Sequence, residues 1–142
     1  MASWKHSIEI DAAADRVFAY LDEPMNLPDW IPGMVEVRNV IGTGAGQQYE
    51  WSYKMAGVVM RGQTTVIEHV LNDCAVHQNI GMISAIWGYC LEPSEHGTRV
   101  TIDVEYSIPI PVIGKLAERI VLRRNEREFH LSMENLKELV EA

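Results

Sequence analysis

Alternating apolar and polar positions are the main pattern of this chain, and they predict a β-sheet. In residues 4–10, Trp4, His6, Ile8 and Ile10 share one face of a strand whose other face is polar. A period of two places successive side chains on opposite faces, so this strand should bury one of them. Further strands are expected at about residues 34–42, 47–55, 58–71, 74–81, 83–92 and 98–108.

Short segments rich in glycine, asparagine and aspartate separate the later strands. Ala56-Gly57 and Asn72-Asp73 are two examples, and both have the length of a hairpin turn. Hairpin spacing favours an antiparallel meander, in which consecutive strands are neighbours. An antiparallel sheet commonly buries one face, so the apolar face needs a cover.

Helical patterns lie before and after the run of strands. The segment Ala12–Leu21 has an apolar stripe that includes Phe18, with Asp11 as its expected N-cap. A second, short helical piece is expected around Met25–Trp30, between prolines. These two pieces should follow the first strand closely.

A long C-terminal helix, Ile113–Glu141, is the expected cover and should cross the concave face of the sheet. The apolar residues of its first half lie mostly on another side than those of its second half. Either the helix bends near Arg123–Arg127, or the first half has a second apolar contact. The stripe expected to face the sheet contains Leu122, Glu126, Phe129, Met133, Leu136 and Val140.

Composition narrows the class of protein. The 142 residues are 47% hydrophobic and 23% charged, as expected for one globular domain over residues 1–142. The net charge of −8 disfavours nucleic acid as a partner. No signal peptide is recognised, and no apolar run reaches the roughly 18 residues of a membrane span. We therefore expect a cytoplasmic protein without stable membrane insertion.

The cysteines and histidines do not form a metal-binding pattern. Cys74 and Cys90 lack a C-x-x-C spacing, and we interpret them as free thiols in a reducing compartment. His6 lies between two apolar neighbours and is interpreted as a core residue. The four other histidines show no ligand spacing, so neither a metal nor another cofactor is expected.

The order of predicted elements resembles the helix-grip fold of the START-like (SRPBCC) superfamily. Three segments carry the resemblance: Asp11–Asp22 in the first helix, Asn26–Gly33 after it, and Gly97–Thr101 at the start of the last strand. The end of the chain, Glu134–Lys137, is similar as well. The resemblance is to the polyketide cyclase/dehydrase-like group, with some likeness to carbon-monoxide-dehydrogenase-subunit-G-like proteins. It implies an α+β fold with about seven strands curved around the C-terminal helix.

The resemblance also implies a hydrophobic cavity between the sheet and that helix. An aromatic stripe supports this, because three same-face aromatics on one strand are large for a tightly packed core, and buried tyrosine hydroxyls need partners. We therefore expect a set of ligand-binding residues from four elements: Tyr49, Trp51, Tyr53, Trp87, Tyr89, Val104, Tyr106, Leu122, Glu126, Phe129 and Met133.

Three functions are compatible with such a cavity. Binding or transport of a lipid, isoprenoid, quinone or polyketide-like molecule is favoured, because no clear acid/base pair points inward. The alternative is a polyketide cyclase/aromatase-type enzyme, whose candidate groups would be Glu126, His6, Tyr49 and Tyr53. Glu126 would have a raised pKa if it faces the cavity, although it can instead reach solvent or pair with an arginine. Asn125 is a further candidate for orienting a ligand carbonyl. The third compatible function is that of a protein-binding module, such as an assembly factor for an enzyme complex.

The apolar run of residues 108–116 is expected to border the mouth of the cavity. It is a candidate gate, dimer contact or lip for transient membrane contact, and ordinary burial is the simplest alternative. Either a monomer or a homodimer is compatible with the sequence.

Overall fold

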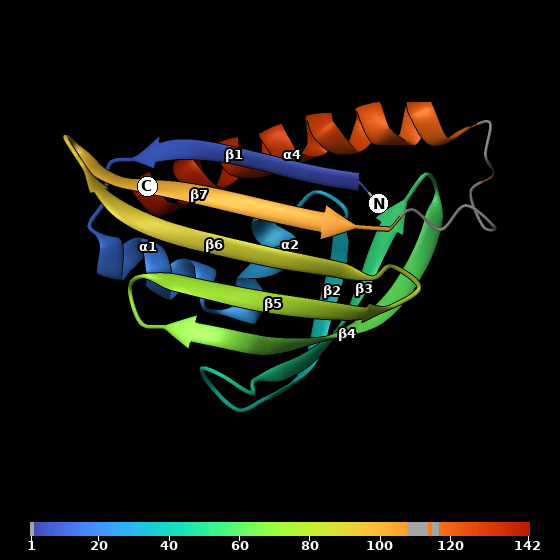
Figure 1. Ribbon diagram of the computed structural model, residues 1–142, viewed down its shortest axis with the longest axis horizontal. Helices are drawn as coiled ribbons and strands as arrows, with labels where there is room; N and C mark the ends of the chain where they lie inside the picture. The colour runs from blue at the N-terminus through green and yellow to red at the C-terminus, as the bar shows by residue number, and fades with distance from the viewer. Residues whose placement is uncertain (1, 108–113, 115–116) are drawn as a thin grey trace.

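The computed structural model describes residues 2–107, 114 and 117–142 as one curved sheet with helices on its inner side (Figure 1). The strands are β1 (Ala2–Ile10), β2 (Met34–Ile41), β3 (Gln48–Met55), β4 (Val58–Val70), β5 (Cys74–Gly81), β6 (Ala85–Ser94) and β7 (Gly97–Tyr106). The helices are α1 (Ala14–Leu21), the 3₁₀ turn η1 (Pro24–Asn26), α2 (Leu27–Trp30) and α4 (Glu118–Glu141).

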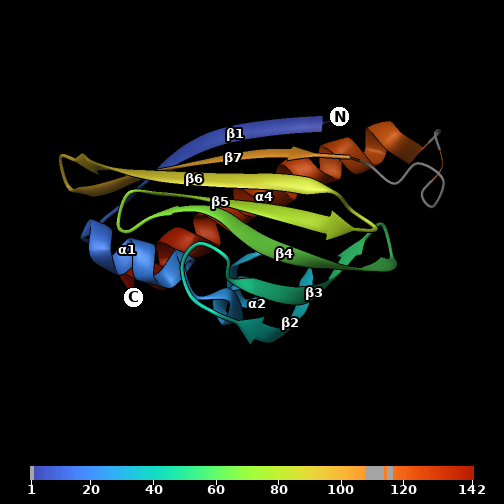
Figure 2. The ribbon, with the colours of Figure 1, turned by 60° about the horizontal axis from the view of Figure 1, so that its bottom comes forward.

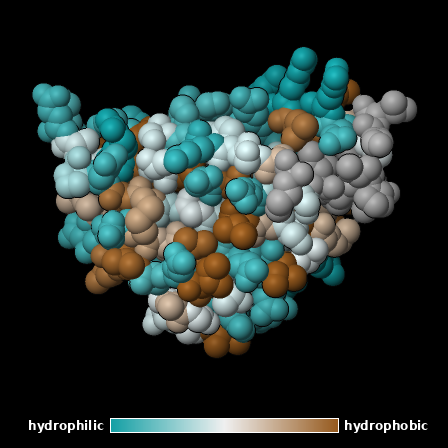
Figure 3. Space-filling model, in the orientation of Figure 1, coloured by the Kyte–Doolittle hydropathy of each residue, from teal (hydrophilic) through white to brown (hydrophobic). Residues whose placement is uncertain are grey.

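The strand order β1-β7-β6-β5-β4-β3-β2 is antiparallel throughout. Hairpins join consecutive strands from β2 to β7, and β1 pairs with β7 along its whole length. Helix α4 runs along the concave side of the sheet, with α1 and α2 beside it (Figure 2). The helix-grip-like α+β fold predicted from the sequence is therefore confirmed. Figure 3 shows the outer face of the sheet, where polar and apolar residues are mixed.

The hairpin turn between β3 and β4 follows from its two residues. Ala56 and Gly57 both have positive φ, at 52° and 80°. A two-residue turn of this kind matches the twist of the strands that it joins. It sets the register in which Trp51 lies opposite Gly62, and this pairing holds the cavity-facing side of β3 in place.

The start of α1 differs from the prediction. Its N-cap is Ala13 and makes no side-chain cap bond, so the expectation that Asp11 caps the helix is wrong. The backbone is still extended at Ala13, which places Asp11 too early to reach the first helical turn. The backbone N–H of Asp11 instead donates to the Glu141 carboxylate at 2.8 Å, and so links this corner to the end of α4.

Packing explains why glycine and threonine occur at positions 97 and 98, at the start of β7. A Cβ atom on Gly97 would lie 2.2 Å from the Ile10 carbonyl oxygen, so any larger residue would displace backbone. The Thr98 hydroxyl donates to the Ala12 carbonyl at 2.7 Å. The two residues fix the end of β1 against β7, at the place where the chain turns into α1.

Helix α4 begins later than predicted. Gly114 has φ +92°, outside the helical region, and the helix starts at Glu118 rather than at residue 113. The rest of the apolar run at 108–116, with its proposed role at the cavity mouth, lies outside the described residues. None of the helices in the described ranges is long and apolar enough to span a bilayer.

The split apolar pattern of α4 results from two separate contacts. Met133, Leu136 and Val140 belong to the larger hydrophobic cluster, which also contains α1. Val121 belongs to a second cluster with Met55 and other residues of β3 and β4. Of the two explanations left open by the sequence, the second apolar contact is the one observed.

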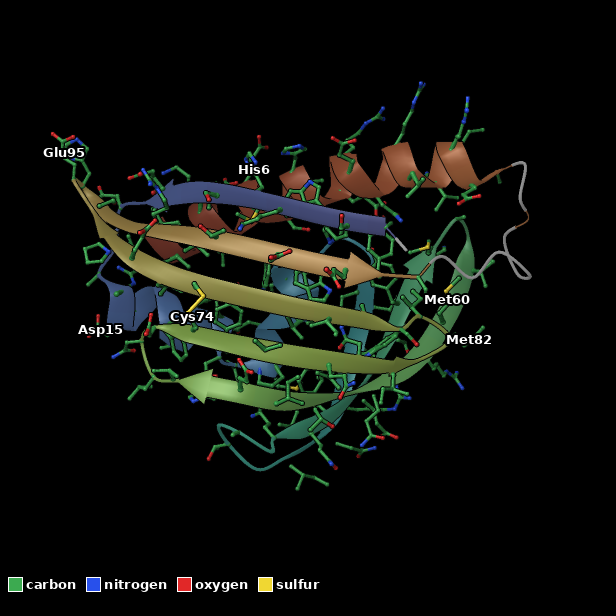
Figure 4. All side chains as sticks on the ribbon, viewed as in Figure 1. His6, Asp15, Met60, Cys74, Met82 and Glu95 are labelled. Carbon is green, nitrogen blue, oxygen red and sulfur yellow. A yellow bond between two sulfur atoms is a disulfide. The ribbon has the colours of Figure 1, made fainter. Side chains whose placement is uncertain are left out.

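The two cysteines form a disulfide, which corrects the prediction of free thiols. Cys74 on β5 and Cys90 on β6 are directly paired in the register and have Cα atoms 4.2 Å apart (Figure 4). Directly opposite residues in an antiparallel pair are close enough to be bridged, although they are far apart in sequence. Because the cysteines are paired, they no longer indicate a reducing compartment.

The disulfide predicts a simple labelling result. Protein denatured without reductant should react with no thiol reagent, whereas protein denatured after reduction should be modified at both Cys74 and Cys90. Mass spectrometry of the two samples measures the difference. Thiol exchange during preparation is prevented by adding the thiol reagent before lysis. Modification of both cysteines in this unreduced sample would contradict the paired state.

Candidate ligand-binding cavity

The inward faces of the strands meet helices α2 and α4 around a cavity of about 100 Å³. The aromatic stripe of β3 forms one wall, because alternate residues from Tyr49 to Met55 point inward. Eight of the residues expected from the sequence line this cavity: Tyr49, Trp51, Tyr53, Trp87, Tyr89, Val104, Tyr106 and Phe129.

The remaining wall was not predicted. One part comes from the segment between β1 and β2, where Leu27, Trp30 and Ile31 face the sheet. The other part is polar and includes His77 on β5. The alternation of Ala75, His77 and Asn79 was a usable signal for an inward face, but polar side chains at two of these positions concealed it. Asn125, a candidate from the sequence, lines the cavity as well. The lining residues that sequence reasoning missed are Leu21, Leu27, Trp30, Ile31, Met34, Met55, Thr64, His77, Asn79, Ile83, Ala85 and Ile102.

Helix α4 presents a different face to the cavity than expected. Glu126 is exposed and, with Leu122, borders a separate hollow beside the start of β1. Asn125, 3% exposed, lines the main cavity instead, and Met133 is buried in the core. Adjacent residues of a helix point about 100° apart, so Asn125 and Glu126 change places when the assumed helix is turned about its axis by roughly that angle. The expectation that Glu126 faces the cavity is wrong.

His6 lies outside the cavity as well. It is exposed on β1, an edge strand, and its ring centroid lies 4.8 Å from that of His130 on α4 (Figure 4). Trp4, from the same face of β1, stacks on Phe129 with centroids 4.9 Å apart. The core interpretation of His6 is wrong, because α4 covers this edge of the sheet only partly.

Tyr49 and His77 form a buried hydrogen bond in the cavity wall. The Tyr49 hydroxyl lies 3.2 Å from Nδ1 of His77, and the donor depends on the tautomer of the ring. Burial raises the pKa of Tyr49 to about 12 and lowers that of His77 from 6.5 to about 4. Both groups are therefore uncharged at neutral pH.

Two further hydrogen bonds hold lining side chains in place. The Trp51 indole N–H donates to the Thr64 hydroxyl at 3.0 Å, and Thr64 in turn contacts Asn79. On the opposite wall, the Asn125 amide donates to the Tyr106 hydroxyl at 3.1 Å. These bonds help to hold the Trp51 and Tyr106 side chains in one orientation.

A carboxylate approaches the cavity wall through Tyr53. The Tyr53 hydroxyl donates to Glu128 at 3.5 Å, and burial raises the pKa of both groups. Arg124 opposes this effect on Glu128. Glu128, half-buried on α4, thus takes the position near the lining that the sequence assigned to Glu126.

Three buried polar atoms of the lining have no hydrogen-bond partner among the described residues: Trp30 Nε1, His77 Nε2 and the Tyr89 hydroxyl. Among the described residues that line the cavity there is no lysine, arginine, aspartate or glutamate. The cavity can therefore accept an apolar molecule and offers a few uncharged hydrogen-bonding groups to it.

Comparison with known proteins identifies the family. Residues 1–141 match the family model described as "Polyketide cyclase / dehydrase and lipid transport". The chain belongs to this family. Membership suggests binding of a hydrophobic ligand, in agreement with the apolar cavity, and does not specify which one. No curated protein sequence gives a significant match.

Solved structures share the fold at low sequence identity. TTHA0849 from Thermus thermophilus is 19% identical with a TM-score of 0.83, and the match covers 98% of this chain and 97% of that one. The di-domain ARO/CYC StfQ from the steffimycin biosynthetic pathway is 16% identical with a TM-score of 0.77, over 98% of this chain and 50% of that one. Ara h 8.0201 is 12% identical with a TM-score of 0.68, over 98% and 97%. At these identities the similarity establishes the fold alone.

Proposed function

We propose that the protein binds and carries, or senses, a hydrophobic small molecule of the lipid, isoprenoid, quinone or polyketide-like kind. The observation that supports the proposal is the cavity itself, with aromatic walls from β3, β6 and β7 and no charged side chain among its described lining residues. Burying apolar ligand surface there is favourable at roughly 25 cal/mol per Å².

The size of the cavity supports entry of a ring. An apolar cavity of roughly 150 Å³ in another protein takes up benzene, and the present cavity has about 100 Å³. The portion of a ligand held inside is therefore no larger than about a single six-membered ring or the end of a branched chain. A longer ligand would extend beyond the described walls.

Binding without chemistry is the function we favour. A cyclase-type reaction needs a group that takes up a proton, and Glu126 and His6 both lie outside the cavity. Tyr49 and Tyr53 line it, but burial raises the pKa of each, so both keep their protons at neutral pH. His77, whose pKa is lowered to about 4, is a weak base for such a step.

Filling the cavity should abolish binding. Ala85 on β6 is 6% exposed and lines the cavity, so Ala85→Leu places an isobutyl group in the space proposed for the ligand. We expect the affinity for toluene to fall by at least about tenfold, while the fold is retained. Chemical-shift titration of ¹⁵N-labelled protein with toluene measures both.

The neighbouring residue provides the control. Ser84 is exposed, and Ser84→Leu adds the same apolar group outside the cavity, so toluene binding should stay as in the wild type. The proposal fails if toluene causes no saturable shifts at cavity residues of the wild-type protein. It also fails if Ala85→Leu, shown to be folded by its spectrum, binds toluene with unchanged affinity. Native mass spectrometry of the purified protein would then search for the natural ligand.

A further inference from the structure

Two side chains that carry unpartnered polar atoms have neighbouring rings in the cavity wall. His77 on β5 and Tyr89 on β6 come from adjacent strands, and their ring centroids are 5.6 Å apart. His77 is 8% exposed and Tyr89 6%, so water reaches neither side chain freely. Within residues 2–107, 114 and 117–142, neither His77 Nε2 nor the Tyr89 hydroxyl has a hydrogen-bond partner.

Buried polar groups in native proteins are normally paired, because an unpaired one carries its full desolvation cost. Trp30 Nε1 is a third unpaired atom of the lining, whereas other polar side chains there are paired, as the Trp51–Thr64 and Asn125–Tyr106 bonds show. Tyr49 holds Nδ1 of His77 at 3.2 Å, which keeps Nε2 in a defined position. The exceptions are thus concentrated on lining residues, where a ligand can supply the missing partner.

We propose that His77 Nε2 and the Tyr89 hydroxyl form a subsite for the uncharged oxygen, a hydroxyl or a carbonyl, of a ring-bearing apolar ligand. This inference rests on the proposed function and specifies its ligand class. A hydroxyl on the ligand can both donate and accept, so it suits either tautomer of the His77 ring. A carbonyl accepts from the Tyr89 hydroxyl.

The electrostatic surroundings exclude a carboxylate from this subsite. No lysine or arginine is found among the described lining residues. Asp22 and His69 are the nearby titratable groups, with the Asp22 carboxylate 3.0 Å from Nε2 of His69. Asp22 acts electrostatically on both His77 and Tyr89, and His69 acts on His77 in the opposite sense. A ligand carboxylate would be buried without a counter-charge and close to a like charge, which is strongly unfavourable. Ionised fatty acids are therefore poor ligands for this end of the cavity.

Three small probes with one scaffold test the subsite: toluene, 4-methylphenol and 4-methylbenzoate. For the wild-type protein at neutral pH, 4-methylphenol should bind about three- to tenfold more tightly than toluene, the range expected from one net hydrogen bond. 4-Methylbenzoate should bind at least about tenfold more weakly than toluene. Chemical-shift titration gives the affinities, and the ¹⁵N signals of the His77 ring should move with 4-methylphenol and much less with toluene.

Two phenylalanine substitutions separate the subsite from the rest of the wall. Tyr89→Phe removes an unpartnered hydroxyl, so it should lower the preference for 4-methylphenol over toluene. Tyr106→Phe removes a lining hydroxyl already bonded to Asn125, and the preference should remain. The subsite is disproved if toluene binds but 4-methylphenol binds no better, or if Tyr89→Phe keeps the preference. Failure of toluene itself to bind would instead disprove the proposed function.

Discussion

Replacing Phe18 with alanine is expected to lower the free energy of unfolding by about 3–5 kcal/mol. Phe18 is 1% exposed and belongs to α1, where it joins the main hydrophobic cluster with Val17 and Leu21. Its ring contacts Tyr89 edge-on, with centroids 5.7 Å apart, so it supports the back of the cavity wall without lining the cavity. Removing it leaves a space that neighbours from a sheet and a helix cannot fill by small movements. Urea denaturation of both proteins measures the change.

Met25→Ala is the matched control for this prediction. Met25 lies in η1, only a few residues after α1, but its side chain is 55% exposed. Its truncation should change the free energy of unfolding by no more than about 0.5 kcal/mol. A loss below about 1 kcal/mol for Phe18→Ala would mean that α1 does not pack on the sheet in solution, since fully buried phenylalanines cost several times more.

Acidification should destabilise the protein through His77. Burial lowers the pKa of this histidine from 6.5 to about 4 in the folded protein. Between these two values the unfolded chain binds a proton at this position and the folded protein does not, so the free energy of unfolding falls as the pH decreases. The loss begins near pH 6.5, is complete below about pH 4, and amounts to about 3 kcal/mol at 1.36 kcal/mol per pH unit.

His77→Gln should remove this part of the pH dependence. The side chain of glutamine is uncharged at all these pH values and can still bond to the Tyr49 hydroxyl, so the acid limb of the stability curve should become flatter. His96→Gln replaces an exposed histidine between β6 and β7 and should leave the limb as in the wild type. Denaturation curves between pH 4 and pH 7 compare the three proteins. Parallel limbs for wild type and His77→Gln would show that His77 is accessible to protons in the folded state.

The faces of the strands were predictable because they depend on neighbours in sequence. The period of two in β3 places Tyr49, Trp51 and Tyr53 on one side wherever the strand packs. Composition then indicated that this side is buried, and the order of elements indicated a long helix as its cover. The seven-strand sheet and its aromatic wall could therefore be predicted from the sequence.

The cavity-facing residues of α4 could not be derived in the same way. A helix offers a continuous choice of orientation, and the apolar stripe of α4 was compatible with two faces because each half packs on a different cluster. The sheet surface decides which face turns inward, and it selected Asn125, which reaches Tyr106, over Glu126. Sequence alone could not weigh these contacts, since they join residues from opposite parts of the chain.

For the polar residues of the cavity, too, the sequence predicted less than the tertiary structure decided. His77 is ordinary in sequence, without metal-ligand spacing or a motif, and becomes distinctive only beside Tyr49 and Tyr89 from two other strands. Cys74 and Cys90 likewise become partners through the β5–β6 register alone. Local alternation thus determined which side chains turn inward on β3, β6 and β7. The tertiary structure decided which of them meet, because burial, pKa and unpaired hydrogen-bonding groups depend on strands brought together across long sequence separations.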